Sequence, residues 1–269
     1  MRTLVHLSDL HFGRVNQAIV RPLLERSWAI GPHLVVISGD LTQRARAAEF
    51  REARAFLDAL PSPRIVVPGN HDVPLYNVLD RFFRPLDRYR EHITEDLSPF
   101  HVDGEIAVLG LNTARSLTIK GGRINRRQIE GIQERMCGLG PEITKIVVTH
   151  HPFDLPEGSP HAVVGRARQA MAAIAACGVD VILSGHLHLS HTGHSAERFE
   201  VGGRSSLIIQ AGTATSTRGR GEQNAFNVIR IGGKNIDIER HFWQPEGGLF
   251  GIASAEHFEE TPRGWVRAA

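Results

Sequence analysis

Continuous apolar runs alternate with amphipathic segments through the first two-thirds of the chain. The first three runs, at 4–7, 34–37 and 65–67, are apolar at nearly every position, which is typical of strands buried on both faces. The segments between them, 16–29 and 45–60, have the apolar spacing of helices. Asn16 can cap the first helix, and Pro22 inside it predicts a late start or a kink. This β-α-β-α-β order predicts a parallel sheet with right-handed crossovers.

The alternation continues to residue 188 and then changes. Before that point we expect helices at 76–89, from residue 125 onward and at 162–177, and strands within 100–111 and at 146–148 and 181–183. Asn125 opens the middle helix, with Gln128 completing a capping box. Beyond residue 188 no helix separates the apolar runs, so we expect an antiparallel second sheet from strands at 199–201, 207–210, 226–231 and 236–242. From Pro245 there is no clear period, and we assign that segment no structure.

We interpret the 269 residues as one domain, in which 1–188 form the βα part, 189–245 are mainly antiparallel and 246–269 are a tail. The apolar fraction of 41 % allows a sizeable core. The formal net charge is only +2 and the basic residues are scattered, whereas a nucleic-acid-binding domain would gather them in a stripe. No nucleic-acid domain is therefore evident.

The sequence also bears on location. No apolar run approaches the ~18 residues of a membrane helix, and Asp9 and His11 come too early for a signal peptide. The two cysteines, Cys137 and Cys177, fall in predicted helices far apart in the sequence, and two thiols in a chain of intracellular type are more often free and packed than bridged. We therefore expect a soluble cytoplasmic protein with no membrane contact, and we leave a homo-oligomer open.

Residues of metal-binding type follow five of the apolar runs. Open α/β sheets bind ligands at the carboxyl ends of their strands, so these residues should meet at one rim. The seven candidate ligands are Asp9, His11, Asp40, Asn70, His150, His186 and His188. Asp9 and His11 are two residues apart, and alternate residues of a strand point to the same side, so both can face one ion. His186 and His188 repeat this spacing.

Seven ligands are too many for one tetrahedral ion and suit two ions that share a carboxylate. Nitrogen and oxygen donors without thiolate favour Mn, Fe or Zn over Mg or Ca. Two ions ~3.5–4 Å apart can clamp the attacking and leaving oxygens of an in-line displacement, and a water bridging them is far more acidic than bulk water. His71 lies beside a ligand but is surplus to the ligand count, so it is the candidate catalytic acid.

These motifs resemble those of the metallophosphoesterase (calcineurin-like phosphoesterase) superfamily in order and approximate spacing. They stand as Asp9-Leu10-His11, Gly39-Asp40, Gly69-Asn70-His71-Asp72, His150 and Gly185-His186-Leu187-His188. The resemblance implies an α/β (α+β) fold, a four-layer αββα sandwich of two mixed β-sheets flanked by helices. It implies one metal held by Asp9, His11, Asp40 and His188, and another held by Asp40, Asn70, His150 and His186. It gives His71 the roles of contacting phosphate and protonating the leaving oxygen.

Within the superfamily the chain is most similar to the class III cyclic-nucleotide phosphodiesterases and the related glycerophosphodiesterases. The cues are the start at 5–11, the His-His-Pro run at 150–152 and the Gly-His-Leu-His box. Protein Ser/Thr phosphatases fit less well, because Gln43 stands where they have a histidine-orienting aspartate. Repair nucleases share the start and Gly13-Arg14, but they carry a DNA-capping domain for which this chain has no room.

Some residues near the motifs allow two interpretations. Arg115 and Arg218 follow predicted strands, and each is either a bidentate phosphate contact or a solvated loop residue; with Asn70 and His71 they are the candidate substrate contacts. Asp72 and His151 are interpreted as supports for ligands rather than as ligands. His6 is interpreted as a core or surface filler. The segment 211–217 either lines the pocket or forms a turn.

We therefore expect a phosphodiesterase with two divalent metal ions (Mn, Fe or Zn) that hydrolyses a small-molecule phosphodiester, first of all a 3′,5′-cyclic nucleotide, by attack of a bridging hydroxide. One alternative is a nucleotide-sugar pyrophosphatase or DNA exonuclease of the same superfamily. The other is a non-catalytic scaffold that binds proteins, against which the complete ligand set argues. The sequence names neither the metal pair nor the substrate.

Overall fold

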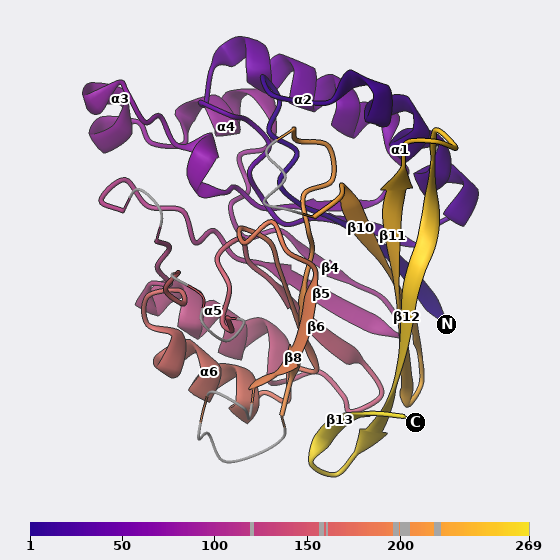
Figure 1. Cartoon of the computed structure of the whole chain (residues 1–269). Coiled ribbons are helices and arrows are strands. Elements are labelled where there is room, and N and C mark those ends of the chain that lie inside the picture. Colours follow the sequence, from indigo (N-terminus) through magenta and orange to yellow (C-terminus); the bar gives the residue numbers. More distant parts are fainter. Residues whose placement is uncertain are drawn as a thin grey trace.

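Two β-sheets lie face to face in the computed structural model of the chain, and helices cover their outer faces (Figure 1). The structure describes residues 1–118, 121–155, 159, 161–195, 199, 205–217 and 222–268. The first sheet contains β1 (Arg2–Leu7), β2 (Leu34–Ile37), β3 (Arg64–Val66), β10 (Ala225–Gly232), β11 (Asn235–Gln244), β12 (Leu249–Thr261) and β13 (Gly264–Arg267). Its strand order is β13-β12-β11-β10-β1-β2-β3.

The second sheet contains β4 (Phe100–Val102), β5 (Ile106–Gly110), β6 (Thr144–Val148), β7 (Val181–Ser184), β8 (His191–His194) and β9 (Leu207–Gln210), in the order β4-β5-β6-β7-β9-β8. The first sheet is covered by α1 (Gln17–Ile30), α2 (Ala47–Ala59) and α4 (Asp87–His92), and the second by α5 (Arg126–Met136) and α6 (Ala167–Ala176). A short helix, α3 (Val78–Phe83), projects from the body, and the 3-10 turn η1 (Asn70–Asp72) follows β3 (Figure 1).

Strand alternation distributes the apolar side chains among three layers of core. In β2, Val35 and Ile37 pack beneath the helices, whereas Leu34 and Val36 face the other sheet. The strand β5 divides its side chains in the same way between α5 and α6 and the core between the sheets. Both faces of these strands are therefore buried, which explains why their runs are continuously apolar. The predicted αββα sandwich of two mixed sheets is confirmed.

The strands beyond residue 188 depart from the expected antiparallel second sheet. The strand β9 pairs in parallel with β7 and extends the second sheet, while β10 pairs antiparallel with β1 and extends the first. A short apolar run shows that a strand forms but not which neighbour it pairs with, because pairing is decided by long-range contacts. The strand expected at 199–201 falls largely outside the described residues, and Phe199 is not in a strand.

The segment beyond Pro245, which was expected to lack regular structure, forms β12 and β13. Most side chains of β12 are exposed or half-buried, so the strand shows no apolar alternation, and its buried anchors are Phe250 and Phe258. Its backbone pairs along β11 with one irregularity, between Arg240 and His241. Backbone pairing with β11, rather than an apolar pattern, gives this segment its structure.

Two predicted helices have different bounds. The helix expected at 76–89 is divided into α3 and α4, because Pro85 disfavours helical backbone at Arg84 just before it. The helix expected at 162–177 begins only at Ala167, after Arg166 in the left-handed conformation (φ 65°). By contrast, Asn16 caps α1 and Asn125 caps α5 in a box with Gln128, as predicted.

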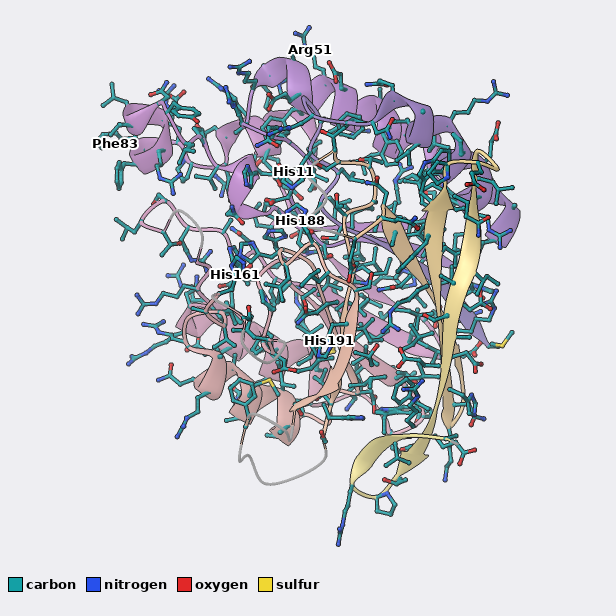
Figure 2. The ribbon with its side chains drawn as sticks, viewed as in Figure 1. His11, Arg51, Phe83, His161, His188 and His191 are labelled. Carbon is teal, nitrogen blue, oxygen red and sulfur yellow. A yellow bond between two sulfur atoms is a disulfide. The ribbon has the colours of Figure 1, made fainter. Side chains whose placement is uncertain are left out.

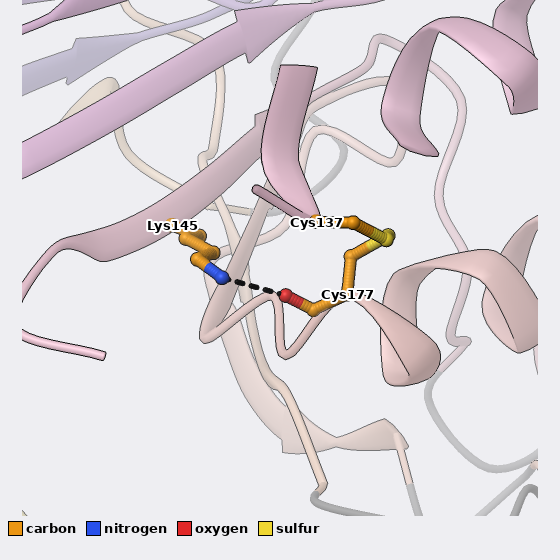
Figure 3. The surroundings of a disulfide bond; sticks show 3 residues. All are labelled: Cys137, Lys145 and Cys177. Atoms are coloured by element: carbon orange, nitrogen blue, oxygen red, sulfur yellow. Dashed lines mark hydrogen bonds between the residues drawn. A yellow bond between two sulfur atoms is a disulfide. The ribbon is translucent and has the colours of Figure 1, made fainter. Parts of the chain in front are cut away.

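The cysteines are joined, contrary to the prediction of two free thiols. Cys137 caps the C-terminus of α5 and Cys177 that of α6, and the structure links them in a disulfide with a Cα–Cα distance of 4.2 Å (Figure 3). Successive crossover helices on one face of a parallel sheet run the same way, so their C-termini lie together although 40 residues separate the cysteines. Lys145 Nζ donates a hydrogen bond to the carbonyl of Cys177 (2.9 Å). Disulfides are rare in the reducing cytoplasm, so the cysteines do not support the expected cytoplasmic location, which stays a prediction.

Apolar side chains are exposed on α3, where Leu79, Phe82 and Phe83 face solvent. Figure 2 shows Phe83 at the projecting end. The helix is anchored by Arg81, which is buried and donates hydrogen bonds to the carbonyls of Pro74 and Thr118.

Among the described residues, no helix is long and apolar enough to cross a membrane.

Candidate metal centre

The seven candidate ligands and His71 lie in loops at the carboxyl ends of five strands, three from the first sheet and two from the second. They are Asp9 and His11 after β1, Asp40 after β2, Asn70 and His71 after β3, His150 after β6, and His186 and His188 after β7. The loops of the two sheets meet: the rings of His11 and His188 stack with their centroids 5.1 Å apart (Figure 2). The structure thus brings all seven side chains to one rim, which we call the ligand rim.

Left-handed backbone shapes this rim. Positive φ angles occur at Asp9 (52°), His11 (53°), Asp40 (54°), His186 (74°) and His188 (59°). The expectation that Asp9 and His11 share a face because a strand continues through them is wrong, since β1 ends at Leu7. Tight left-handed turns aim the side chains instead. Each such residue costs about 1–2 kcal/mol relative to ordinary backbone, so the rim stores strain.

The glycines of the motifs make room for the ligands. A Cβ on Gly69 would collide with the backbone nitrogen and Oδ1 of Asp40, and one on Gly185 would collide with Ser8 Oγ. A Cβ on Gly39 would lie 2.7 Å from Nδ1 of His150. These glycines are thus explained by close approach between loops of different strands, which the motif spacing alone does not show.

The first donor group is formed by Asp9, His11 and His188. Asp9 Oδ1 lies 3.5 Å from His11 Nε2 and 3.4 Å from His188 Nε2, and all three side chains are buried. Asp9 Oδ2 is occupied, because it accepts hydrogen bonds from Ser8 Oγ (2.7 Å) and from the backbone N–H of His186 (3.0 Å). Among the described residues, Asp9 Oδ1 and His11 Nε2 have no hydrogen-bond partner, although both are buried.

The second donor group is centred on His150. Its Nε2 lies 3.1 Å from Asn70 Oδ1, 3.3 Å from His186 Nδ1 and 3.4 Å from Asp40 Oδ2. The Nδ1–H of His150 donates to the carbonyl of Ser38 (2.7 Å), which directs Nε2 toward these atoms. Asp40 Oδ2 also lies 3.7 Å from His11 Nε2, so one carboxylate oxygen stands between the two groups.

The electrostatics of the rim favour a cation. Burial raises the pKa of the Asp40 carboxyl, but the nearby charge of His150 outweighs burial and holds it well below its usual range. Burial likewise raises the pKa of Asp9, and His188 and His11 bring it below normal. Burial lowers the pKa of His150, but Asp40 raises it to about 9. His186 is different: burial and the charge of His150 lower its pKa to about 3.

His71 lies at the edge of both groups. Its backbone N–H donates to Asp40 Oδ1 (2.8 Å), and its ring meets that of His11 edge-on with centroids 4.8 Å apart. Its Nδ1 lies 2.8 Å from the carbonyl of Gln43, which holds the ring with Nδ1 as the donor. At the position where protein phosphatases have an aspartate, the backbone of Gln43 therefore orients the histidine. With the proton on Nδ1, the neutral ring has its lone pair on Nε2.

Sequence reasoning did not identify the residues that brace the ligand loops. Thr213 Oγ1 donates to the carbonyl of Asp9 (2.8 Å), and Thr215 Oγ1 donates to that of Leu10 (2.7 Å). These two hydrogen bonds attach the segment 211–217 to the loop that carries Asp9. Ser8 could have been suspected because it adjoins a ligand, but nothing local to the threonines indicates contacts across more than 200 residues.

Asp72 connects two ligand loops, as its interpretation as a support implies. Its carboxylate accepts hydrogen bonds from the backbone N–H groups of Gly69, Leu41 and Thr42. Burial and the nearby charge of Asp40 raise the pKa of Asp72 to about 6. His6 is buried in the core, with Nε2 2.9 Å from Ser38 Oγ, and burial lowers its pKa to about 3.

Of the two candidate substrate arginines, the structure describes Arg115, and the hydrogen bonds of its guanidinium are made away from the donor groups. Arg115 donates to the carbonyls of Asn112 and Ala114 and to Gln128 Oε1, so its guanidinium is held by its own loop and by α5. Burial lowers its pKa. Arg218 lies outside the described residues. Phosphate binding by either arginine stays a prediction.

The donor atoms present fit divalent metal ions. Carboxylate, amide and imidazole donors without thiolate suit borderline transition metals. Groups of acidic and imidazole donors whose candidate ligand atoms all lie within 4.8 Å of one another include Asp9-His11-His188 and Asp9-Asp40-His150. Buried polar atoms without partners cost free energy unless a ligand or ion satisfies them. The fold and the rim thus define an αββα scaffold whose buried donor atoms could hold divalent metal ions.

The family profile described as calcineurin-like phosphoesterase matches residues 2–190, and the chain belongs to that family. Over 85 residues it is 34 % identical to "Glycerophosphodiester phosphodiesterase GpdQ" of Enterobacter lignolyticus, covering 26 % of this chain and 29 % of that protein. Over 121 residues it is 28 % identical to "Probable glycerophosphodiester phosphodiesterase GpdQ" of Arcobacter nitrofigilis, covering 45 % and 42 %. The matches therefore span less than half the length of these relatives.

Solved structures share the fold. Purple acid phosphatase PPD1 from yellow lupin (Lupinus luteus) superposes with a TM-score of 0.71 at 12 % identity, covering 95 % of this chain and 53 % of that one. Vacuolar Protein Sorting 29 from Cryptosporidium parvum superposes with a TM-score of 0.52 at 13 % identity, covering 96 % and 98 %. At these identities the likeness concerns the arrangement of sheets and helices. The family membership itself rests on the sequence match over residues 2–190.

Proposed function

We propose that the chain is a dinuclear phosphodiesterase that hydrolyses a small phosphodiester, with a 3′,5′-cyclic nucleotide as its first candidate substrate. The observation that carries this proposal is the position of Asp40 Oδ2, 3.7 Å from His11 Nε2 and 3.4 Å from His150 Nε2. One carboxylate oxygen between two buried donor groups suits a pair of ions that share it. Bound divalent ions would supply positive charge at phosphoryl oxygens and lower the pKa of a water molecule.

The residues of the chain would hold the ions and supply a proton. Asp9, His11 and His188 would hold one ion and Asn70, His150 and His186 the other, with Asp40 common to both. His71, held at Nδ1 by Gln43, would give a proton from Nε2 to the leaving oxygen. A positioned acid of this kind contributes typically 10²–10⁴-fold to the rate.

The first test combines metal analysis with turnover. Purified protein is loaded with Mn²⁺ and assayed with bis(p-nitrophenyl) phosphate and with cyclic AMP. We expect two bound ions and activity that chelation abolishes. Asn70→Ala should lose one ion and most activity, whereas His257→Ala, at a half-exposed histidine of β12, should change neither. Activity that persists after chelation or in Asn70→Ala contradicts the proposal, and protein that binds no metal points to the scaffold alternative.

The acid role of His71 has its own test. His71→Ala should keep both ions and lose 10²–10⁴-fold in kcat on a substrate with a poor leaving group. The loss should be much smaller with p-nitrophenolate, which departs without a proton. An equal loss on both substrates would show that His71 positions phosphate without transferring a proton.

A glycerophosphodiester is the second candidate substrate, because two relatives carry that activity in their names. A panel of cyclic AMP, glycerophosphocholine, a nucleotide sugar and single-stranded DNA separates the candidates by kcat/KM. The scattered basic residues lead us to expect DNA last. DNA binding that weakens steeply with salt would instead favour the exonuclease alternative.

A further inference from the structure

His151 is a buried imidazole beside the ligands that the seven-ligand count does not use. Its side chain is 1 % exposed, and its ring centroid lies 5.0 Å from that of His150 and 4.8 Å from that of His186. One ring nitrogen of each of these three histidines lies within 4.8 Å of the others. Nε2 of His151 has no hydrogen-bond partner among the described residues. A buried donor or acceptor left in this state costs about 1–3 kcal/mol.

Thr113 decides which ring nitrogen of His151 carries the proton. Its Oγ1 lies 2.8 Å from His151 Nδ1 and also accepts the backbone N–H of His151 at 3.3 Å. A hydroxyl has one proton to donate. Among the described residues, Nδ1 is the one acceptor for it, so the hydroxyl donates to Nδ1 and the ring proton belongs on Nε2. This tautomer is assigned from the hydrogen-bond network.

The two neighbouring histidines therefore have opposite tautomers. His150 donates from Nδ1 to the carbonyl of Ser38, which leaves the lone pair of Nε2 for an ion. His151 accepts at Nδ1, which leaves Nε2–H as a donor. A nitrogen that carries a proton has no lone pair for a metal. This hydrogen-bond pattern suits His150 to metal binding and His151 to the binding of an oxygen.

The ring of His151 is fixed in place. A Cβ on Gly122 would collide with Cγ and Nδ1 of His151, so the glycine backbone packs directly against the ring. The next residue, Arg123, donates its backbone N–H to the carbonyl of Thr113 (2.9 Å) and thereby ties this segment to Thr113. Nε2–H is consequently a preorganised donor, which needs no rearrangement when a ligand binds.

We propose that His151 donates a hydrogen bond from Nε2 to a phosphoryl oxygen bound beside His150 and His186, and that it is not a metal ligand. This proposal rests on the proposed phosphodiesterase function. It gives the His-His pair two roles, one nitrogen for an ion and one N–H for the substrate. A preorganised donor of this kind is worth about 10²–10³-fold in kcat where charge develops at the oxygen.

The experiment compares His151→Phe, which keeps the ring shape and removes the donor, with His151→Gln, which restores an N–H. Metal content is measured on the Mn²⁺-loaded protein, affinity for inorganic phosphate by calorimetry, and kcat with bis(p-nitrophenyl) phosphate. We expect unchanged metal content in both variants. His151→Phe should weaken phosphate binding about 10- to 100-fold, as expected for loss of a hydrogen bond to a charged group, and His151→Gln should recover most of it.

Loss of an ion from His151→Phe would identify His151 as a ligand and overturn the proposal, as would unchanged phosphate affinity. If His151→Phe does not fold, Thr113→Val and Gly122→Ala keep the test, because the first removes the hydroxyl that sets the tautomer and the second displaces the ring. Both should weaken phosphate binding without loss of metal. If the wild-type protein binds metal and phosphate but turns over no phosphodiester, the proposed function fails while the donor role is still decided.

Discussion

The ligand rim and the antiparallel ribbon of β10–β13 use left-handed backbone in opposite ways. In the rim, five of the left-handed positions are occupied by aspartate or histidine residues that are candidate ligands. In the ribbon, the left-handed positions are Gly233 (φ 59°), Gly248 (φ 60°) and Gly264 (φ 118°), where the absence of a Cβ removes the steric cost. The rim therefore holds its donor side chains in place with strained backbone, whereas the ribbon has little backbone strain and contributes stability. Substitutions in the two regions should accordingly affect different properties.

The largest expected effect follows removal of the shared carboxylate. If the proposed dinuclear site is correct, Asp40→Ala should lose both ions or hold them weakly, and kcat/KM should fall by about 10³-fold or more, because bound ions of this kind would contribute several kcal/mol to the transition state. Metal content and phosphodiesterase turnover measure it. The matched control is Asp237→Ala, a half-exposed aspartate of the ribbon, which should leave both unchanged. Loss of metal from Asp237→Ala would contradict the expectation that the rim and the ribbon determine different properties.

Core truncation in the ribbon should show the reverse pattern. Phe258 of β12 is 2 % exposed and packs in the core between the sheets. Phe258→Ala should lower the free energy of unfolding by about 3–5 kcal/mol, since it removes a large buried side chain and leaves a cavity. Denaturant titration measures the loss, and the folded variant should keep its metal content. Phe82→Ala, on exposed α3, should stay within about 0.5 kcal/mol of wild type.

A single added methyl group should distinguish crowded from open positions. Gly69→Ala places a Cβ against the backbone and carboxylate of Asp40, so it should cost about 1–3 kcal/mol and reduce metal affinity. Gly131→Ala, in the middle of α5 with no atom within 4 Å of the new Cβ, should instead stabilise the protein by about 0.5–1 kcal/mol. Metal titration and thermal unfolding of both variants check this. Equal behaviour would remove the argument that the rim is sterically crowded.

The smallest expected effect is a pH dependence that originates in the ribbon. Burial lowers the pKa of His241 on β11, although Glu239 at 3.1 Å opposes this, so the folded protein keeps the ring neutral. The unfolded chain binds the proton more readily, near its ordinary pKa of about 6.5. The stability from neutral His241 is therefore complete above that pH and is lost as the pH falls through the folded pKa. His241→Gln should show a flatter loss of stability between pH 7 and pH 5 than wild type.

Much of the fold and of the rim was already determined by the sequence. Continuous apolar runs followed at once by Asp, Asn or His predicted the parallel strands and the side chains that meet at their carboxyl ends. Both signals are local, because burial on two faces requires an apolar run and a loop begins where the run ends. The capping residues Asn16 and Asn125 were predictable for the same reason.

The tertiary structure decided what depends on contacts between distant segments. The pairing of β10 with β1, the disulfide between Cys137 and Cys177, and the threonines that brace Asp9 join residues separated by 40 positions or more. The left-handed turns at the ligands oppose the backbone preference of Asp and His, so only the surrounding contacts can impose them. Local sequence thus specifies which donor atoms arrive at the rim, while long-range packing specifies the directions in which they point.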